Sequence, residues 1–268
     1  MPALLRSLPA RRALAQELVL VEECDSTHQV LRDLVQERAD ANAQLPPSTL
    51  VVTEHQIDGR GRRGPGWWSG SKAQNIALSL MLPSPSKPAE AIGLHAACAV
   101  ADVLRPHLSN DVEIGLKWPN DIFLAGAKVG GLLVEVSELH GQSFALIGLG
   151  LNLLQAPPRR VAPYPMAAVA NFTPAAGLDR TQFVASWLWA FEKRLRWAEK
   201  NDHRQLERDF LGHLRNWAPH GVLDPASGHR GPLVEFSVQR GLTWGQKGDL
   251  LTQPLGWIPT LEALPAAT

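Results

Sequence analysis

Two short segments carry most of the residues that could do chemistry, and the first is the run GRGRRG at residues 59–64. It places three arginines between three glycines, so backbone amides and positive charge lie on one loop. This combination suits a phosphate or another anion. Arginines on a flexible loop could also close over a ligand and keep water from a reactive intermediate. The alternative is a solvated basic turn without a ligand.

The second segment is KWPND at residues 117–121, followed by KVGG at residues 128–131. It places two lysines, an amide and a carboxylate around a tight turn, and its two glycines permit close approach of a ligand to the backbone. A compact ammonium such as that of Lys128 offsets the charge repulsion when a carboxylate attacks a phosphate. Lys117 is the rival cation. The alternatives are that Lys128 is an ordinary surface lysine and that Asn120 and Asp121 only shape the turn.

Composition bounds the class of protein. The chain has 268 residues, of which 45% are hydrophobic, and its net charge is zero at a pI of about 7.1. This is enough for a large core, and it lacks the basic excess of a dedicated nucleic-acid binder. Cys24 and Cys98 are expected to be free thiols, and most of the nine tryptophans to be packing residues. Without a signal peptide or a membrane span, we expect a soluble cytoplasmic protein.

Periodicity predicts alternating strands and helices in the first two thirds of the chain. Two further helices follow residues 155–174, which we expect to form a long surface loop, and Thr181 is the expected N-cap of the first of them. After residue 219 the pattern changes to short strand-like pieces. The predicted strands are 18–21, 49–53, 75–82, 112–116, 122–124, 129–136, 144–154, 234–238, 250–251 and 257–258. The first predicted helix starts within residues 25–27, the second spans 89–104, and two more contain the apolar stripes 183–195 and 206–214.

The two segments stand between DSTHQ at residues 25–29 and LIGLGLNL at residues 146–153. In this order they resemble the bacterial biotin protein ligases, over about residues 20–214. The resemblance implies an α/β (α+β) fold. A mixed-sheet, class II synthetase-like catalytic domain would span residues 1–218, and a small C-terminal SH3-like β domain would span residues 219–268.

The resemblance also implies an activity. Members of this family activate biotin with MgATP to biotinoyl-5′-adenylate and then transfer biotin to a lysine of a biotin carboxyl carrier protein. Lys128 and Arg60 would be the catalytic residues, and no metal ligand is expected in the protein. The family pattern assigns Ser26, Thr27, His28, Gln56, Gly59, Arg60, Lys128 and Gly131 to biotin, and Arg60, Arg62, Arg63, Trp68, Asn120, Asp121, Lys128 and Asn152 to the nucleotide.

Two departures from the family pattern stand out. His28 occupies the position where the family usually has Asn, and Ala170 falls where some members have an aromatic residue that stacks on adenine. About twenty residues precede the first motif, so we expect the ligase-only type without a DNA-binding domain and without DNA or membrane as partners. A homodimer is possible. Two alternatives stay open: a ligase for another carboxylate cofactor such as lipoate, and a biotin-dependent binding or regulatory protein.

Overall fold

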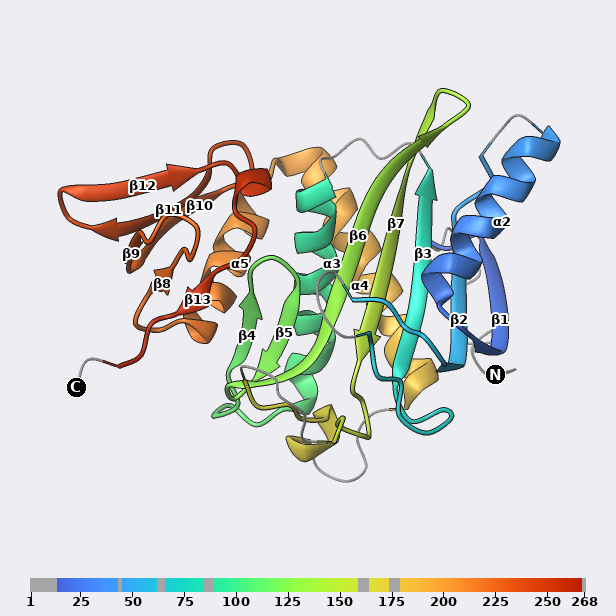
Figure 1. Cartoon of the computed structure of the whole chain (residues 1–268), viewed down its shortest axis with the longest axis horizontal. Coiled ribbons are helices and arrows are strands. Elements are labelled where there is room, and N and C mark those ends of the chain that lie inside the picture. Colours follow the sequence, from blue (N-terminus) through green and yellow to red (C-terminus); the bar gives the residue numbers. More distant parts are fainter. Residues whose placement is uncertain are drawn as a thin grey trace.

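The centre of the molecule is a seven-stranded mixed sheet (Figure 1). The computed structural model describes residues 14–42, 45–61, 66–83, 89–158, 164–173 and 179–266. β1 and β2 pair in parallel, and every other neighbouring pair is antiparallel. In spatial order the strands are β1 (Glu17–Cys24), β2 (Thr49–Gln56), β3 (Ile76–Pro83), β7 (Gln142–Leu151), β6 (Ala127–Leu139), β5 (Asp121–Leu124) and β4 (Ile114–Lys117).

Helices cover the two faces of this sheet unequally. α2 (Thr27–Asn42) lies on one face, against β2, β3 and the N-terminal half of β7. α3 (Ala89–Leu104) and α4 (Arg180–Asn201) pack on the opposite face, and α5 (Arg204–Trp217) packs beside β4. Figure 1 shows α3 and α4 behind the central strands and α2 in front at one edge. The face that α2 covers only in part is called the α2 face below.

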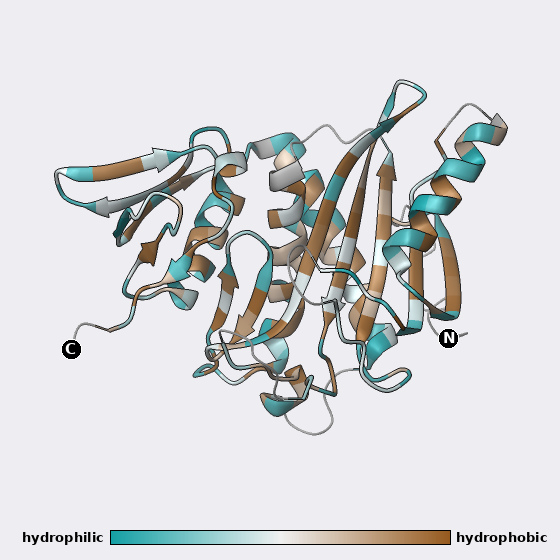
Figure 2. Cartoon of the chain, in the orientation of Figure 1, coloured by the Kyte–Doolittle hydropathy of each residue, from teal (hydrophilic) through white to brown (hydrophobic). Residues whose placement is uncertain are grey.

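The alternation of β7 explains why the two faces differ. Ala145, Ile147 and Leu149 point into the main core with α3 and α4. Phe144 and Leu146 point to the other side, where they join a smaller cluster with α2. Continuing that alternation brings glycines 148 and 150 to the α2 face, beyond the end of the helix. The alternation is visible as bands of colour along the strands in Figure 2.

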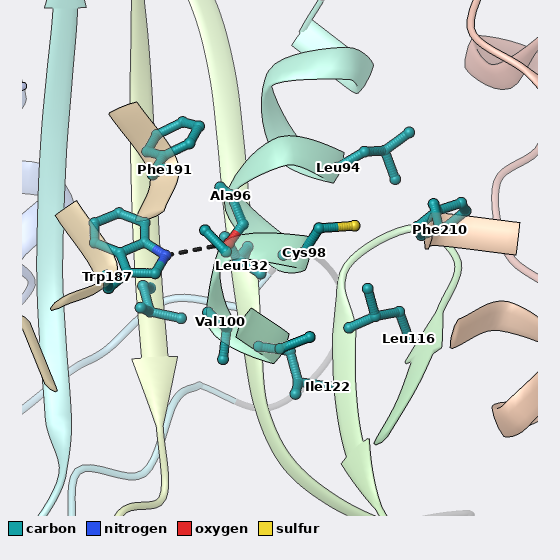
Figure 3. Close-up of a cluster of buried hydrophobic side chains, with 14 of the residues drawn as sticks. Leu94, Ala96, Cys98, Val100, Leu116, Ile122, Leu132, Trp187, Phe191 and Phe210 are labelled. Carbon is teal, nitrogen blue, oxygen red and sulfur yellow. Dashed lines mark hydrogen bonds between the residues drawn. The ribbon is translucent and has the colours of Figure 1, made fainter. Parts of the chain in front are cut away.

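The main core is built around α3, whose middle residues are almost fully buried. Trp187 of α4 packs there, and its indole Nε1 donates a hydrogen bond of 3.1 Å to the carbonyl of Ala96 (Figure 3). Cys98 is buried in this cluster and Cys24 is half-buried. Both are free thiols, as the sequence predicts.

Two small antiparallel sheets follow α5, in the strand orders β10-β11-β12 and β13-β8-β9. Their core is continuous with that of the large part, because Phe236 and Trp244 belong to the same buried cluster as α3. Trp118 Nε1 also donates to the Ile258 carbonyl at 2.7 Å. That residues 219–268 form a separate domain stays a prediction. The strands are β8 (Val222–Leu223), β9 (Arg230–Gly231), β10 (Leu233–Ser237), β11 (Gly241–Gln246), β12 (Asp249–Gln253) and β13 (Glu262–Ala263).

Three local predictions are wrong. The N-cap of α4 is Asp179, whose carboxylate accepts from the backbone N–H of Gln182; Thr181 lies inside the helix. Residues 155–174 are not a plain surface loop, since a short 3₁₀ helix (Val169–Asn171) buries Val169 within it. Trp257 ends another 3₁₀ helix (Leu255–Trp257) where a strand was expected. A third short 3₁₀ helix (Arg105–His107) follows α3.

Five of the nine tryptophans are buried or partly buried, in line with the expectation that most are packing residues. Trp118, Trp187 and Trp244 are buried, but four of the nine are exposed: Trp68, Trp189, Trp197 and Trp257. Among the helices that the structure describes, none is long and apolar enough to cross a membrane.

Candidate functional site

A buried polar cluster forms where α2 begins, because the start of the helix abuts the end of β2. The backbone N–H of Thr27 donates to Gln56 Oε1 at 2.7 Å, and its hydroxyl lies 3.0 Å from the same oxygen. The Thr27 hydroxyl also lies 2.9 Å from Ser79 Oγ on β3. Ser26 is buried beside them and accepts from the Val30 N–H through its carbonyl. Three separate elements therefore fix these hydroxyl and amide groups in place.

His28 extends this cluster toward β6. Its Nε2 lies 3.2 Å from Glu135 Oε2, and the same carboxylate pairs with Arg32. Burial holds the pKa of His28 below its ordinary value, although Glu135 acts in the opposite direction. Burial raises the pKa of Glu135, but His28 and Arg32 outweigh it and bring that pKa below its ordinary value. A neutral imidazole beside an ionised carboxylate follows.

Small residues form the part of the α2 face next to this cluster. Gly148 of β7 is paired with Ser79 on one side and with Leu133 on the other, and Gly150 is paired with Gly131. Gly131, Gly148 and Gly150 are all partly exposed although they lie in central strands. We call these three glycines the glycine floor. They leave the backbone of the sheet open to close approach by a ligand.

Trp67 packs over one end of the glycine floor. A Cβ added to Gly150 would meet the Trp67 ring at 2.7 Å, so only glycine fits beneath the indole. The position of Trp67 is fixed by a bridge to Gly59, whose carbonyl accepts from the Trp67 N–H at 2.6 Å. The glycine that opens the arginine-rich run and the indole that follows the run are thereby held on the α2 face.

A β-bulge brings Lys128 to the same face. Asp121 is paired with Gly131 and Ile122 with Gly130, but Phe123 is paired with Lys128, so Val129 is the extra residue. Val129 is fully buried in the main core. The shift of one residue therefore turns Lys128 to the α2 face, where its Cε lies 3.9 Å from a Cβ added to Gly131.

Asp121 ties the groups at this end of the floor together. One carboxylate oxygen accepts from Lys128 Nζ, and the other accepts from the Tyr164 hydroxyl at 3.1 Å. The Tyr164 ring contacts two ammonium groups, with its centroid 5.7 Å from Lys128 Nζ and 5.8 Å from Lys117 Nζ. Burial lowers the pKa of Lys117, which Asp121 partly offsets, and burial followed by Asp121 raises the pKa of Tyr164. Lys128, Asp121, Tyr164 and Lys117 thus form one charged network.

Two amides hold the segments around Lys128. Asn120 Nδ2 donates to the Leu132 carbonyl at 2.6 Å, which braces the turn before β5. Asn152 is buried, and its Nδ2 donates to the Ala167 carbonyl at 3.2 Å. The Lys128 N–H donates to the Pro165 carbonyl at 2.8 Å. These bonds seat the segment that carries Tyr164 against β6.

Comparison with known proteins now identifies the core of the chain, since residues 20–152 match the model of the Biotin/lipoate A/B protein ligase family. The chain belongs to this family. It is 35% identical over 178 residues to the biotin–[acetyl-CoA-carboxylase] ligase of Mycobacterium tuberculosis, covering 65% of this chain and 63% of the relative. It is 34% identical to the bifunctional ligase/repressor BirA of Escherichia coli, covering 57% of this chain and 47% of the relative. The chain spans between about half and two thirds of the length of these two relatives.

Solved structures confirm the fold of this family member. The biotin protein ligase from Aquifex aeolicus in complex with biotin and ATP has a TM-score of 0.70 at 22% identity, covering 93% of this chain and 100% of that chain. The biotin acetyl coenzyme A carboxylase synthetase from Helicobacter pylori has a TM-score of 0.57 at 21% identity, covering 88% and 99%. The predicted mixed α/β sheet with small C-terminal β sheets is correct.

The α2 face brings together most of the residues that the ligase resemblance singles out: Ser26, Thr27, His28, Gln56, Gly59, Asn120, Asp121, Lys128, Gly131 and Asn152. Arg60 is exposed but close enough to influence the His28 pKa. Trp68 is 37% exposed, while Trp67 makes the contact with the floor. Arg62 and Arg63 lie outside the described residues. The ligand assignments of all these residues stay predictions.

Several polar groups on the α2 face are absent from the sequence predictions. Ser79 and Glu135 come from strands where nothing but alternation marks them, and Tyr164 comes from a segment expected to be a loop. The two-residue spacing of the glycines in LIGLGLNL was a usable signal, because it places both on one face. In the described part of the chain, no group of three or more His, Cys, Asp or Glu side chains could hold a metal ion.

Proposed function

We propose that this protein is a biotin protein ligase. It joins biotin to ATP, forming biotinoyl-5′-adenylate and releasing pyrophosphate. It then transfers the biotinoyl group to a lysine amine of a biotin carboxyl carrier protein and releases AMP. The family match, the biotin ligases among the relatives and the composition of the α2 face support this proposal.

One observation carries the proposal furthest. A cluster of hydroxyl, amide and imidazole groups lies at one end of the glycine floor, and the Lys128 ammonium lies at the other. Gly148 on β7 is paired with Leu133 on β6, and Gly131 lies two residues before Leu133 on β6. The two ends of the floor are therefore about 7 Å apart along the strand direction. A molecule with a polar ring at one end and a carboxylate a short chain away matches this spacing. Biotin has this shape.

Lys128 is the group that offsets charge in the first step. The attack of a carboxylate on the α-phosphate of ATP brings two anions together, and a fixed ammonium stabilises the charge that develops on the phosphoryl oxygens. Asp121 holds the Lys128 ammonium in a part-buried position. The protein itself therefore fixes the place of this ammonium, so little reorganisation is needed.

Mg²⁺ enters this proposal as part of the nucleotide substrate. Both carboxylate oxygens of Asp121 already accept hydrogen bonds, from Lys128 and Tyr164. The phosphates of ATP supply most of the oxygen ligands that Mg²⁺ needs. Arg60 and the neighbouring arginines of the GRGRRG run are the proposed partners of the phosphates and the adenylate. A homodimer, expected from the resemblance, and a cytoplasmic location, expected from the sequence, are further parts of the proposal.

The test is transfer to a carrier. The purified protein is incubated with biotin, MgATP and a biotin carboxyl carrier domain, and the intact mass of the carrier is measured. We expect a gain of one biotinoyl group that requires ATP and disappears when the acceptor lysine of the carrier is replaced by arginine. Lipoate in place of biotin is the matched control. Transfer of lipoate but not of biotin, or binding of biotin without any adenylate, would overturn the proposal.

A further inference from the structure

His28 has one ring nitrogen that the structure leaves available. Nε2 lies 3.2 Å from the carboxylate of Glu135. Nδ1 is buried and has no hydrogen-bond partner among the residues that the structure describes. The whole residue is only 5% exposed, so solvent does not satisfy this atom. A buried polar atom without a partner is costly, which makes this nitrogen a candidate for a ligand contact.

The state of the ring follows from its partner. An ionised carboxylate can only accept, so Nε2 carries the proton and Nδ1 carries a lone pair. Glu135 is itself fixed by Arg32, which pairs with the same carboxylate oxygen. The Glu135–Arg32 pair therefore selects the tautomer in which Nδ1 is a hydrogen-bond acceptor.

The available nitrogen faces the glycine floor. A Cβ added to Gly148 would lie 3.3 Å from His28 Nδ1, 3.6 Å from Ser79 Oγ and 3.7 Å from Leu133 Cβ. The space above Gly148 is thus bordered by a nitrogen that only accepts and by a hydroxyl that is already linked to Thr27. A ligand group placed there needs an N–H or O–H donor beside His28.

We propose that His28 determines the specificity of the site by accepting a hydrogen bond from a ureido N–H of biotin. This inference rests on the proposed function. It also explains how an imidazole serves where the family usually has an asparagine, because the amide oxygen of Asn is an acceptor as well. A dithiolane ring has no N–H, so lipoate would leave Nδ1 buried without a partner. Discrimination against a ligand that lacks such a donor is strong when the acceptor cannot reach water.

The first test is a cycle that combines a substitution with a modified ligand. Biotin and its two ureido N-methyl analogues are titrated into wild type, His28→Leu and His28→Asn by calorimetry. His28→Leu should weaken biotin about tenfold, the loss of one buried hydrogen bond of about 1.4 kcal/mol. His28→Asn should restore most of that affinity. One N-methyl analogue should bind wild type and His28→Leu equally, since its donor is already blocked.

The matched control is His140→Asn. His140 also pairs with a carboxylate, Asp40, at 3.1 Å, but it lies exposed in the turn between β6 and β7. Its φ of +50° is one that Asn tolerates. This variant should bind biotin as wild type does, and circular dichroism should show all variants folded.

The second test measures how biotin affinity depends on pH. If His28 had only a structural role, its protonation would not change biotin affinity. Burial lowers the pKa of His28, so the imidazole stays neutral down to a lower pH than an ordinary histidine does. Protonation at lower pH turns Nδ1 into a donor and removes the acceptor. The charged groups that act on the ring are Glu135 on β6, Arg32 on α2 and Arg60 after β2. Wild-type affinity for biotin should therefore fall as the pH drops through the lowered pKa of His28, and that of His28→Leu should change much less with pH.

The outcomes distinguish failure of the His28 proposal from failure of the ligase proposal. Equal biotin affinity in wild type and His28→Leu, with the same pH profile, would overturn the role of His28 and leave the ligase proposal standing. Equal sensitivity of both N-methyl analogues to His28→Leu would also overturn it. Absence of any biotin binding by wild type would overturn both proposals together.

Discussion

The charges at the Lys128 end of the floor form a single network rather than a set of independent pairs. Asp121 accepts from Lys128 and Tyr164 at once, and the Tyr164 ring lies within 6 Å of the ammonium groups of both Lys128 and Lys117. The sequence pointed to Asp121 and Lys128 because they stand in a short motif. It gave no signal for Tyr164, because its contact depends on how the segment after Asn152 returns to β6. Sequence motifs therefore predict which residues belong to the site. Contacts between residues far apart in sequence, such as that of Tyr164 with Asp121, depend on the tertiary structure.

Replacing Tyr164 with Phe tests the hydroxyl alone, because the ring and its packing against Phe123 remain. Asp121 loses one of its two donors, so its carboxylate should hold Lys128 less firmly. We expect the free energy of unfolding to fall by about 1 kcal/mol. Adenylate formation should slow by about fivefold while the dissociation constant of biotin stays unchanged. Urea unfolding and single-turnover kinetics measure the two effects. An unchanged rate would mean that the Tyr164 hydroxyl has only a structural role.

At the scale of elements, strand register positions the site. Periodicity predicted the strands, and alternation on β7 placed Gly148 and Gly150 on one face. The bulge at Val129 could not be predicted, since an unbroken alternation from Gly131 would turn Lys128 toward the core. The α4 N-cap was misplaced for a similar reason. Asp179 and Thr181 are both good caps, and only the path of the preceding chain selects between them.

The glycine floor gives a prediction at this scale. Gly150→Ala should displace Trp67, because the added Cβ would meet the indole at 2.7 Å. Biotin should then bind at least about tenfold more weakly, and the emission of the indole should shift as it becomes more exposed to water. Calorimetry and fluorescence measure these effects.

Gly212→Ala on α5 is the matched control. A Cβ there has nothing within 4 Å, so it should stabilise the helix by about 0.8 kcal/mol and leave biotin affinity unchanged. If Gly150→Ala behaved in the same way as Gly212→Ala, the floor would not be a close-approach surface.

At the scale of the whole molecule, one hydrophobic cluster runs from α3 through α5 into the C-terminal sheets. Phe210 packs its ring 5.0 Å from that of Phe236, and Trp118 donates to the Ile258 carbonyl. Trp118 lies two residues before Asn120, so this bond ties the C-terminal segment to the turn that carries Asn120 and Asp121. The change of pattern after residue 219 predicted these sheets, but it could not predict how much core they share with the rest.

A shared core predicts a shared unfolding transition. Urea denaturation followed by far-UV circular dichroism and by tryptophan fluorescence should give coincident curves with one midpoint. The tryptophans report on both parts, since Trp187 lies on α4 and Trp244 on β11. Two separated transitions would show that residues 219–268 unfold independently.

In the proposed reaction Lys128, turned onto the α2 face by the bulge, promotes the attack of biotin on ATP. Single-turnover formation of biotinoyl-5′-adenylate by wild type, Lys128→Ala and the control Lys193→Ala tests it most directly. Lys193 lies on α4, over the ring of the exposed Trp189, and its loss should change nothing. We predict that Lys128→Ala stays folded but forms adenylate about 10²- to 10³-fold more slowly, as when one oxyanion donor is removed. A loss of less than about tenfold in Lys128→Ala would contradict the account.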